Sequence, residues 1–135
     1  DNYASWQSMR MSVASMLAMS LLGVPMTGAD VCGFAGNTTE ELCVRWTQLG
    51  ALYPFARNHN DNLSAPQEPY VWPRVADALR VALRTRYALS PLYYTELAAA
   101  HRNGTTVARP MLFEFAADAA THELDRQFMI GDVLL

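Results

Sequence analysis

An alternation of short apolar segments with longer helical ones is the strongest constraint on how this 135-residue chain can fold. The sequence predicts three strand-like runs, over residues 24–29, 107–115 and 128–135, and three helical segments, over residues 6–22, 39–53 and 75–100. This alternation is typical of a parallel α/β sheet or barrel. Two or three strands cannot close a barrel and would leave an unpaired edge. We therefore expect the chain to be incomplete without more protein around it.

Local signals mark where the helices begin and end. Thr38 or Thr39 is suited to cap the second helix, because a threonine hydroxyl accepts hydrogen bonds from first-turn N–H groups. Pro91 should kink or divide the third helical segment. The Asn-, Pro- and Asp-rich stretch 54–73 is a long loop, and such loops in compact domains are usually functional.

The composition excludes several functional classes. All ten basic residues are Arg and the formal net charge is −3, whereas nucleic-acid binders usually present a basic face. The apolar stretch 9–26 is interrupted by Arg10 and three serines, which favours a buried helix over a targeting signal or a membrane span. We therefore expect no nucleic-acid partner and no membrane span in this chain.

The cysteines and the N-x-S/T triplets indicate in which cellular compartment the protein folds. Cys32 and Cys43 are the only cysteines, and two sulfur ligands eleven residues apart fit no four-ligand metal site. They form either a short-loop disulfide or two buried thiols. Triplets at Asn37, Asn62 and Asn103 are candidate glycosylation sites and favour an oxidising secretory compartment. We expect neither a metal nor a cofactor.

Two aspartates stand where strands of a parallel α/β fold would end. Asp30 follows the run 24–29, and Asp1 precedes the first helix. Polar residues just past such strand ends tend to form the active site, and two neighbouring carboxylates are what glycoside hydrolysis needs. An aspartate at a loop–helix junction is more often a helix cap, so this signal alone is weak.

The residues around Asp30 carry a more specific pattern, made of three motifs: Gly28-Ala29-Asp30-Val31-Cys32-Gly33-Phe34, Glu41-Leu42-Cys43-Val44-Arg45-Trp46 and Gly50-Ala51-Leu52-Tyr53-Pro54-Phe55-Ala56-Arg57-Asn58-His59-Asn60. The pattern resembles the second signature region of the family 31 glycoside hydrolases, in the branch of lysosomal and intestinal α-glucosidases. The resemblance covers nearly the whole chain, continuing through Gln67-Glu68-Pro69-Tyr70, Arg86-Tyr87, Ala108-Arg109-Pro110 and Gln127-Phe128.

This resemblance implies part of a (β/α)8 TIM barrel that is incomplete alone. Residues 1–116 would run from about the end of the sixth strand through the eighth, and residues 117–135 would begin the following β-domain. The family's reaction is retaining hydrolysis of terminal α-linked glucose in maltose-type oligosaccharides, glycogen or starch. The implied location is the secretory pathway, with the protein lysosomal, secreted or at the cell surface.

The resemblance also implies site residues. Asp1 would be the catalytic acid/base, and Asp30, His59, Arg57 and Phe34 would bind the substrate. Three of these residues have a simpler alternative role. Arg57 can pair with an acidic residue that orients the loop, His59 can be structural, and Phe34 can belong to the core.

The Cys32–Cys43 pair is similar to that of the same branch, which implies a disulfide beside the pocket. Of the three candidate glycosylation sites, Asn37 is favoured because it lies on the loop inside that disulfide.

The nucleophile that this family carries in a Trp-x-Asp-Met-Asn-Glu-like run has no match here. We therefore expect the chain alone to be inactive and to need the remainder of the same enzyme as its partner, with an α-glucoside as substrate. The alternative is a non-catalytic homologue that binds carbohydrate or serves as an assembly subunit.

Overall fold

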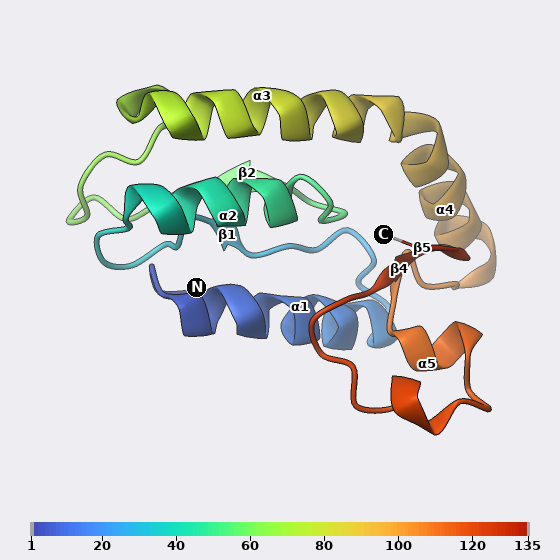
Figure 1. Ribbon diagram of the computed structural model, residues 1–135. Coiled ribbons are helices and arrows are strands. Elements are labelled where there is room, and N and C mark those ends of the chain that lie inside the picture. Colours follow the sequence, from blue (N-terminus) through green and yellow to red (C-terminus); the bar gives the residue numbers. More distant parts are fainter. Residues whose placement is uncertain (1, 135) are drawn as a thin grey trace.

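The computed structural model describes residues 2–134 (Figure 1). Its elements in chain order are α1 (Trp6–Leu21), β1 (Asp30–Val31), α2 (Glu40–Gly50), β2 (Arg57–Asn58), η1 (Pro69–Val71), α3 (Pro73–Ala88), α4 (Ser90–Asn103), β3 (Ala108–Arg109), α5 (Met111–Glu114), η2 (Ala119–Thr121), β4 (Met129–Ile130) and β5 (Val133–Leu134).

The predicted α/β organisation is confirmed. β1 and β2 pair in parallel through the crossover helix α2, with Asp30 opposite Arg57 and Val31 opposite Asn58. In Figure 1 the carboxyl ends of both strands and the amino ends of α1, α2 and α3 lie at the same, left-hand end of the molecule. Parallel α/β folds place their binding residues at this end.

The first strand differs from the prediction. Residues 24–29 form no strand, because Pro25 has no N–H to donate and the main-chain hydrogen bonds there form no ladder. Thr27 O accepts from Phe55 N at 3.1 Å, and Val24 N donates back to Met19 O at 2.9 Å. The strand begins instead at Asp30, which is buried at 7% exposure. Asp30 is thus held by the sheet itself and does not follow it.

Helix α1 begins where a serine caps it. The Ser5 side chain accepts a hydrogen bond from Ser8 N at 3.1 Å. One face of the helix is buried, and its residues follow helical spacing: Ser12, Val13, Met16, Leu17 and Ser20. The predicted helix over 6–22 is confirmed to within one residue.

Helix α2 is capped by the second of the two candidate threonines. Thr39 Oγ1 accepts a hydrogen bond from Leu42 N at 3.3 Å, and two glutamates occupy the first turn, where the helix dipole favours them. Its Trp46 is fully buried and donates from Nε1 to the Tyr53 hydroxyl at 3.1 Å. That hydroxyl also contacts Ser12 of α1. Burial raises the pKa of Tyr53, so the phenol stays protonated and links α1 to α2.

Prolines divide the third helical segment as predicted. α3 begins at Pro73, whose missing N–H is not needed in a first turn, and Pro91 lies in the first turn of α4. Arg86, near the end of α3, donates to the carbonyls of Ala51 at 2.7 Å, Tyr53 at 2.5 Å and Pro54 at 3.0 Å. Its guanidinium lies 5.0 Å from the Tyr93 ring centroid. Arg86 therefore joins α3 to the turn that leads from α2 into β2.

The C-terminal part is antiparallel and contains less strand than predicted. In 107–115 the strand β3 ends at Arg109, because Pro110 cannot donate to a ladder and instead begins the short helix α5. In 128–135 the chain forms a hairpin of β4 and β5 that turns at Gly131, whose φ of 58° suits glycine. β3 pairs with β4, with Ala108 opposite Ile130.

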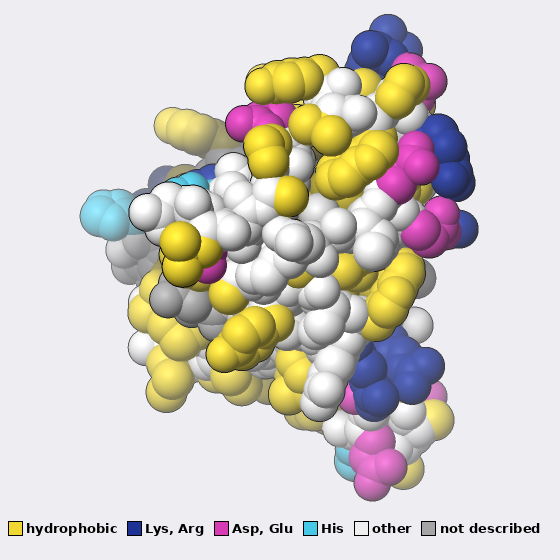
Figure 2. Space-filling view, turned by 90° about the vertical axis from the view of Figure 1, so that its left-hand side faces the viewer, with side chains coloured by type: hydrophobic (Ala, Val, Ile, Leu, Met, Phe, Trp, Pro, Cys, Tyr) yellow, Lys and Arg dark blue, Asp and Glu magenta, His cyan; other side chains and the backbone are white. Residues whose placement is uncertain are grey.

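Much apolar surface stays exposed on the described residues. The large exposed side chains include Tyr3, Trp6, Leu22, Leu63, Tyr70, Val81, Tyr87 and Tyr94. Figure 2 views the end where the strands terminate, with hydrophobic side chains scattered over it and charged ones gathered along one margin. This surface agrees with a barrel that is incomplete alone. None of the helices in 2–134 has both the length and the apolar character needed to cross a membrane.

We expect Arg86→Ala to lower the free energy of unfolding by about 2 kcal/mol or more, because three carbonyls lose a charged donor. Urea unfolding of the folded protein that contains this chain measures the loss. Arg84→Ala on the same helix is the control, since Arg84 is exposed and makes no ion pair within residues 2–134. Equal midpoints for the two variants would contradict the role given to Arg86.

Candidate active site

An ion pair between neighbouring strands is the centre of the site. Arg57 of β2 donates to Asp30 Oδ1 of β1 from Nε at 2.9 Å and from Nη2 at 2.6 Å. The Asp30 side chain is buried, whereas that of Arg57 is half exposed. Both bonds end on Oδ1, so within residues 2–134 the other oxygen, Oδ2, has no hydrogen-bond partner. A fixed carboxylate with an unused oxygen can accept hydrogen bonds from a ligand.

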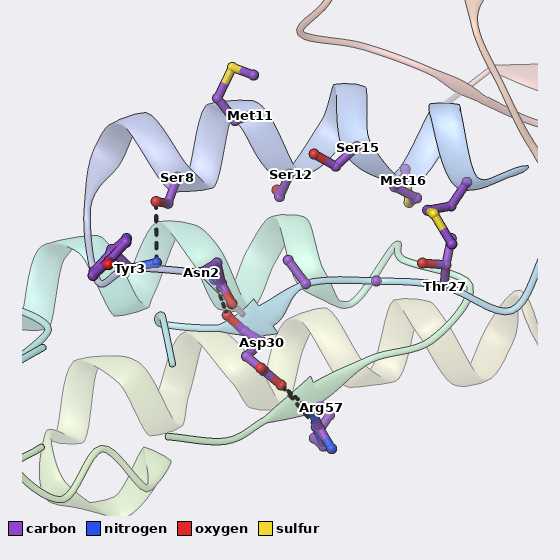
Figure 3. A pocket seen from close by; sticks show the side chains of 13 residues that line it. Asn2, Tyr3, Ser8, Met11, Ser12, Ser15, Met16, Thr27, Asp30 and Arg57 are labelled. Carbon is purple, nitrogen blue, oxygen red and sulfur yellow. Dashed lines mark hydrogen bonds and ion pairs between the residues drawn. The ribbon is translucent and has the colours of Figure 1, made fainter. Parts of the chain in front are cut away.

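The side chains of this pair point away from α1 (Figure 3). On the α1 side, a cavity of about 450 Å³ lies between the helix and β1, lined by serines and methionines of α1 and by the main chain around Asp30. Asn2 reaches across it and donates from Nδ2 to the carbonyl of Asp30 at 3.0 Å (Figure 3). β1 is thus held on one edge by the segment before α1 and on the other by β2.

The loop after β1 takes a conformation that its residues enforce. Cys32 has a φ of 75° and Gly33 a φ of 100°. A Cβ at Gly33 would collide with the backbone of Ala4, so glycine is required for this close approach. Cys32 is joined by a disulfide to Cys43 of α2, with Cα atoms 4.7 Å apart. The predicted disulfide is confirmed, and it fixes the loop between Asp30 and Phe34 to the helix behind it.

Phe34 and His59 meet at the ends of the two strands. Their ring centroids are 5.3 Å apart at an angle of 42°. Phe34 is partly buried and His59 is exposed, so the pair offers one apolar and one polar face to solvent. The Phe34 carbonyl accepts from Asp61 N at 3.0 Å, which joins the two loops. Hydrogen bonds from Ser64 and Leu63 lower the pKa of Asp61, so its carboxylate stays charged and stabilises that turn.

A buried amide lies beneath both loops. Gln67, 2% exposed, donates from Nε2 to the carbonyl of Gly33 at 3.0 Å and to Asn58 Oδ1 at 3.0 Å. Asn58 in turn donates from Nδ2 to the Gln67 carbonyl at 3.0 Å. Sequence reasoning assigned no role to Gln67, although it lies in one of the quoted motifs. Its interactions are with main-chain atoms distant in sequence, which no local signal reveals.

The structure places four of the five predicted site residues in two pairs, Asp30 with Arg57 and Phe34 with His59. The alternative role of Arg57, pairing with an acidic residue, is observed, and that acidic residue is Asp30. Asp1 lies outside the described residues. Within residues 2–134, no three His, Cys, Asp or Glu side chains are arranged to hold a metal ion.

The match to known families decides the identity of this fold. Residues 1–96 match the glycosyl hydrolases family 31 TIM-barrel domain, and residues 104–135 match the glycosyl hydrolase family 31 C-terminal domain. The chain belongs to glycosyl hydrolase family 31. The predicted (β/α)8 fold class is thereby confirmed, with β1 and β2 as neighbouring strands of an incomplete TIM barrel.

Curated relatives in family 31 support the branch expected from the motifs. The chain is 56% identical to lysosomal alpha-glucosidase of Rattus norvegicus over its whole length, and 51% identical to alpha-glucosidase of Hordeum vulgare over 97% of it. It spans only 14% and 15% of those proteins.

Solved family 31 structures have the same fold. The glucosidase II alpha subunit matches 97% of this chain with a TM-score of 0.90 and 38% identity, and the match covers 14% of that chain. A family 31 alpha-glucosidase from Bacteroides thetaiotaomicron matches 98% of this chain with a TM-score of 0.93 and 39% identity, over 23% of its own length.

We expect native, unreduced material to show no reactive thiol, because Cys32 and Cys43 are paired and fully buried. Alkylation under denaturing, non-reducing conditions followed by peptide mass measurement tests this. The peptides should gain two alkyl groups only after reduction. Labelling before reduction would contradict the disulfide.

Proposed function

We propose that this chain is the part of a retaining, exo-acting α-glucosidase that binds the terminal glucose and supplies the acid/base. The observation that carries the proposal is the buried Asp30 carboxylate, which Arg57 fixes through Oδ1, whereas Oδ2 has no hydrogen-bond partner among residues 2–134. The relatives named alpha-glucosidase support this choice of glycoside.

The residue types suit a pyranose. An Asp30 carboxylate held rigidly can accept hydrogen bonds from adjacent sugar hydroxyls and so select their geometry. His59 can donate to a further hydroxyl, and the Phe34 ring can pack on the apolar C–H face of the sugar. Arg57 holds the Asp30 carboxylate in one orientation, and its half-exposed guanidinium can also contact the ligand.

Asp1 is proposed as the acid/base on the family motif alone, since Asp1 itself lies outside the described residues. Its carboxylic acid would protonate the leaving glycosidic oxygen and its carboxylate would then deprotonate the incoming water. Retention also needs a nucleophilic carboxylate about 5–5.5 Å away. That group would come from the remainder of the enzyme, which is the proposed partner of this chain.

Several finer predictions stand with this proposal. Asn37, Asn62 and Asn103 are all exposed and stay candidate glycosylation sites in a lysosomal, secreted or cell-surface protein. The boundary between the barrel and the following β-domain at 116/117 also stays a prediction. Pairing of Ala108 with Ile130 crosses that boundary.

The function is tested with the complete protein that contains this chain. NMR of the glucose released from 4-nitrophenyl α-glucoside across about pH 4 to 7 should show α-glucose first, as retention requires, since this glycoside releases a single sugar. Release of β-glucose first would contradict a retaining mechanism. No release by folded protein that binds maltose would favour the non-catalytic carbohydrate-binding homologue.

Asp30→Asn should lower kcat/KM for maltose by about 100-fold or more, because the Arg57 charge loses its partner and the sugar loses a charged acceptor. Asp77→Asn is the matched control, since Asp77 is exposed on α3 and pairs only with Arg80 among residues 2–134. Glucose-release kinetics on both variants give the comparison. A control as damaged as Asp30→Asn would argue against a specific role.

Asp1→Asn should separate substrates by their leaving groups. Maltose needs protonation of its leaving oxygen, whereas 4-nitrophenol leaves well without it, so kcat/KM should fall about 100-fold more for maltose than for 4-nitrophenyl α-glucoside. Steady-state rates on the two substrates measure the difference. Equal losses would remove the acid role from Asp1.

A further inference from the structure

One buried side chain contacts the loops that follow both parallel strands. Gln67 lies between β2 and η1, and its Nε2 group donates to the carbonyls of Gly33 at 3.0 Å, Val31 at 3.3 Å and His59 at 3.3 Å. It also donates to Asn58 Oδ1 at 3.0 Å. Val31 lies in β1 and Gly33 in the loop after it, whereas Asn58 lies in β2 and His59 in the loop after that strand.

Each of these acceptors is next to, or within, a proposed sugar-binding residue. Val31 directly follows Asp30, and Gly33 directly precedes Phe34. The same amide group therefore fixes the main chain at two points between the carboxylate and the aromatic ring.

The second loop is held in the same way. Asn58 directly follows Arg57, and the carbonyl that Gln67 contacts at 3.3 Å is that of His59 itself. Asn58 Nδ2 returns a hydrogen bond to the Gln67 carbonyl at 3.0 Å, so the contact between this loop and the amide is reciprocal.

The orientation of the amide follows from its surroundings. Four oxygen acceptors face the Nε2 side. A flipped amide would direct a carbonyl oxygen at these acceptors, which is repulsive. Within residues 2–134 the buried Gln67 Oε1 has no hydrogen-bond partner. Leaving this buried oxygen unpaired costs free energy, but the same orientation of the amide lets Nε2 donate to the acceptors of both loops.

We infer that Gln67 is a positioning residue of the sugar-binding site. It sets the placement of Asp30 and Phe34, on β1 and the loop after it, relative to Arg57 and His59, on β2 and the loop after it. The inference rests on the proposed function, because its test measures hydrolysis of a glucoside and binding of an inhibitor. Gln67 does not contact the substrate in this role. It acts through the main chain, so its loss should weaken substrate binding while the protein stays folded.

Gln67→Glu keeps the size of the side chain, removes its N–H donors and adds an ionisable carboxyl group. At neutral pH a carboxylate oxygen would face the four acceptors. Burial raises the pKa of an introduced carboxyl, so acid restores a neutral group with one O–H donor. Gln67→Met removes the donors at every pH. Gln48→Glu, on an exposed position of α2, is the control for the added charge.

The measurement is kcat and KM of the complete protein on 4-nitrophenyl α-glucoside from about pH 4 to 7, well below the unfolding temperature. Each variant is expressed as a ratio to wild type at the same pH, because the wild type carries the same ionisable neighbours: Asp30, Arg57, His59, Glu68 and Asp61. Circular dichroism and binding of 1-deoxynojirimycin accompany the kinetics.

For Gln67→Glu we expect KM to rise about tenfold at pH 7 with kcat changed less than about threefold, and the ratio to recover as the pH falls. Gln67→Met should show the rise at every pH, and Gln48→Glu should match wild type.

Folded variants with unchanged KM and inhibitor affinity, beside an active wild type, overturn the inference alone. Loss of fold in both Gln67 variants assigns the residue to stability and also overturns it. A wild type that neither hydrolyses the glucoside nor binds the inhibitor overturns the proposed function together with the inference.

Discussion

The parallel register of β1 and β2 is the constraint on which the site depends. It places Asp30 opposite Arg57, so two charged side chains from separate strands meet at 2.6 Å with the carboxylate buried. A buried carboxylate without that partner would be costly, because desolvation disfavours its charge. A shift of one strand by one residue would turn its charged side chain to the other face of the sheet and so break the pair.

The loops around this pair are fixed by several independent cross-links. The disulfide from Cys32 to Cys43 anchors the first loop to α2, Asn2 holds the outer edge of β1, and Gln67 joins the two loops from beneath. A rigid scaffold of this kind suits recognition of a sugar, because little conformational entropy is left to lose on binding.

The C-terminal part is coupled to the helices by a partly buried ion network. Arg109 of β3 contacts Glu96 of α4 at 3.1 Å and Glu114 of α5 at 2.8 Å, and all three side chains are less than one-third exposed. Glu96 also packs where a side chain at Gly131 would otherwise lie. This network connects the residues matching the barrel domain to those matching the C-terminal domain.

The sequence by itself determined helices α1 to α4 and the fold class, and its motifs supplied the proposed site residues. Helical period, the Thr39 cap and the prolines at 73 and 91 act within a few residues, so local chemistry sufficed to predict α1 to α4. The proposed site residues rest on the resemblance of the motifs around Asp30 to family 31, not on local chemistry of this kind. The tertiary structure alone decided the length of the strands, the partner of Arg57 and the position of Gln67. Those features depend on which distant main-chain groups meet, and a single sequence does not encode that in any local pattern.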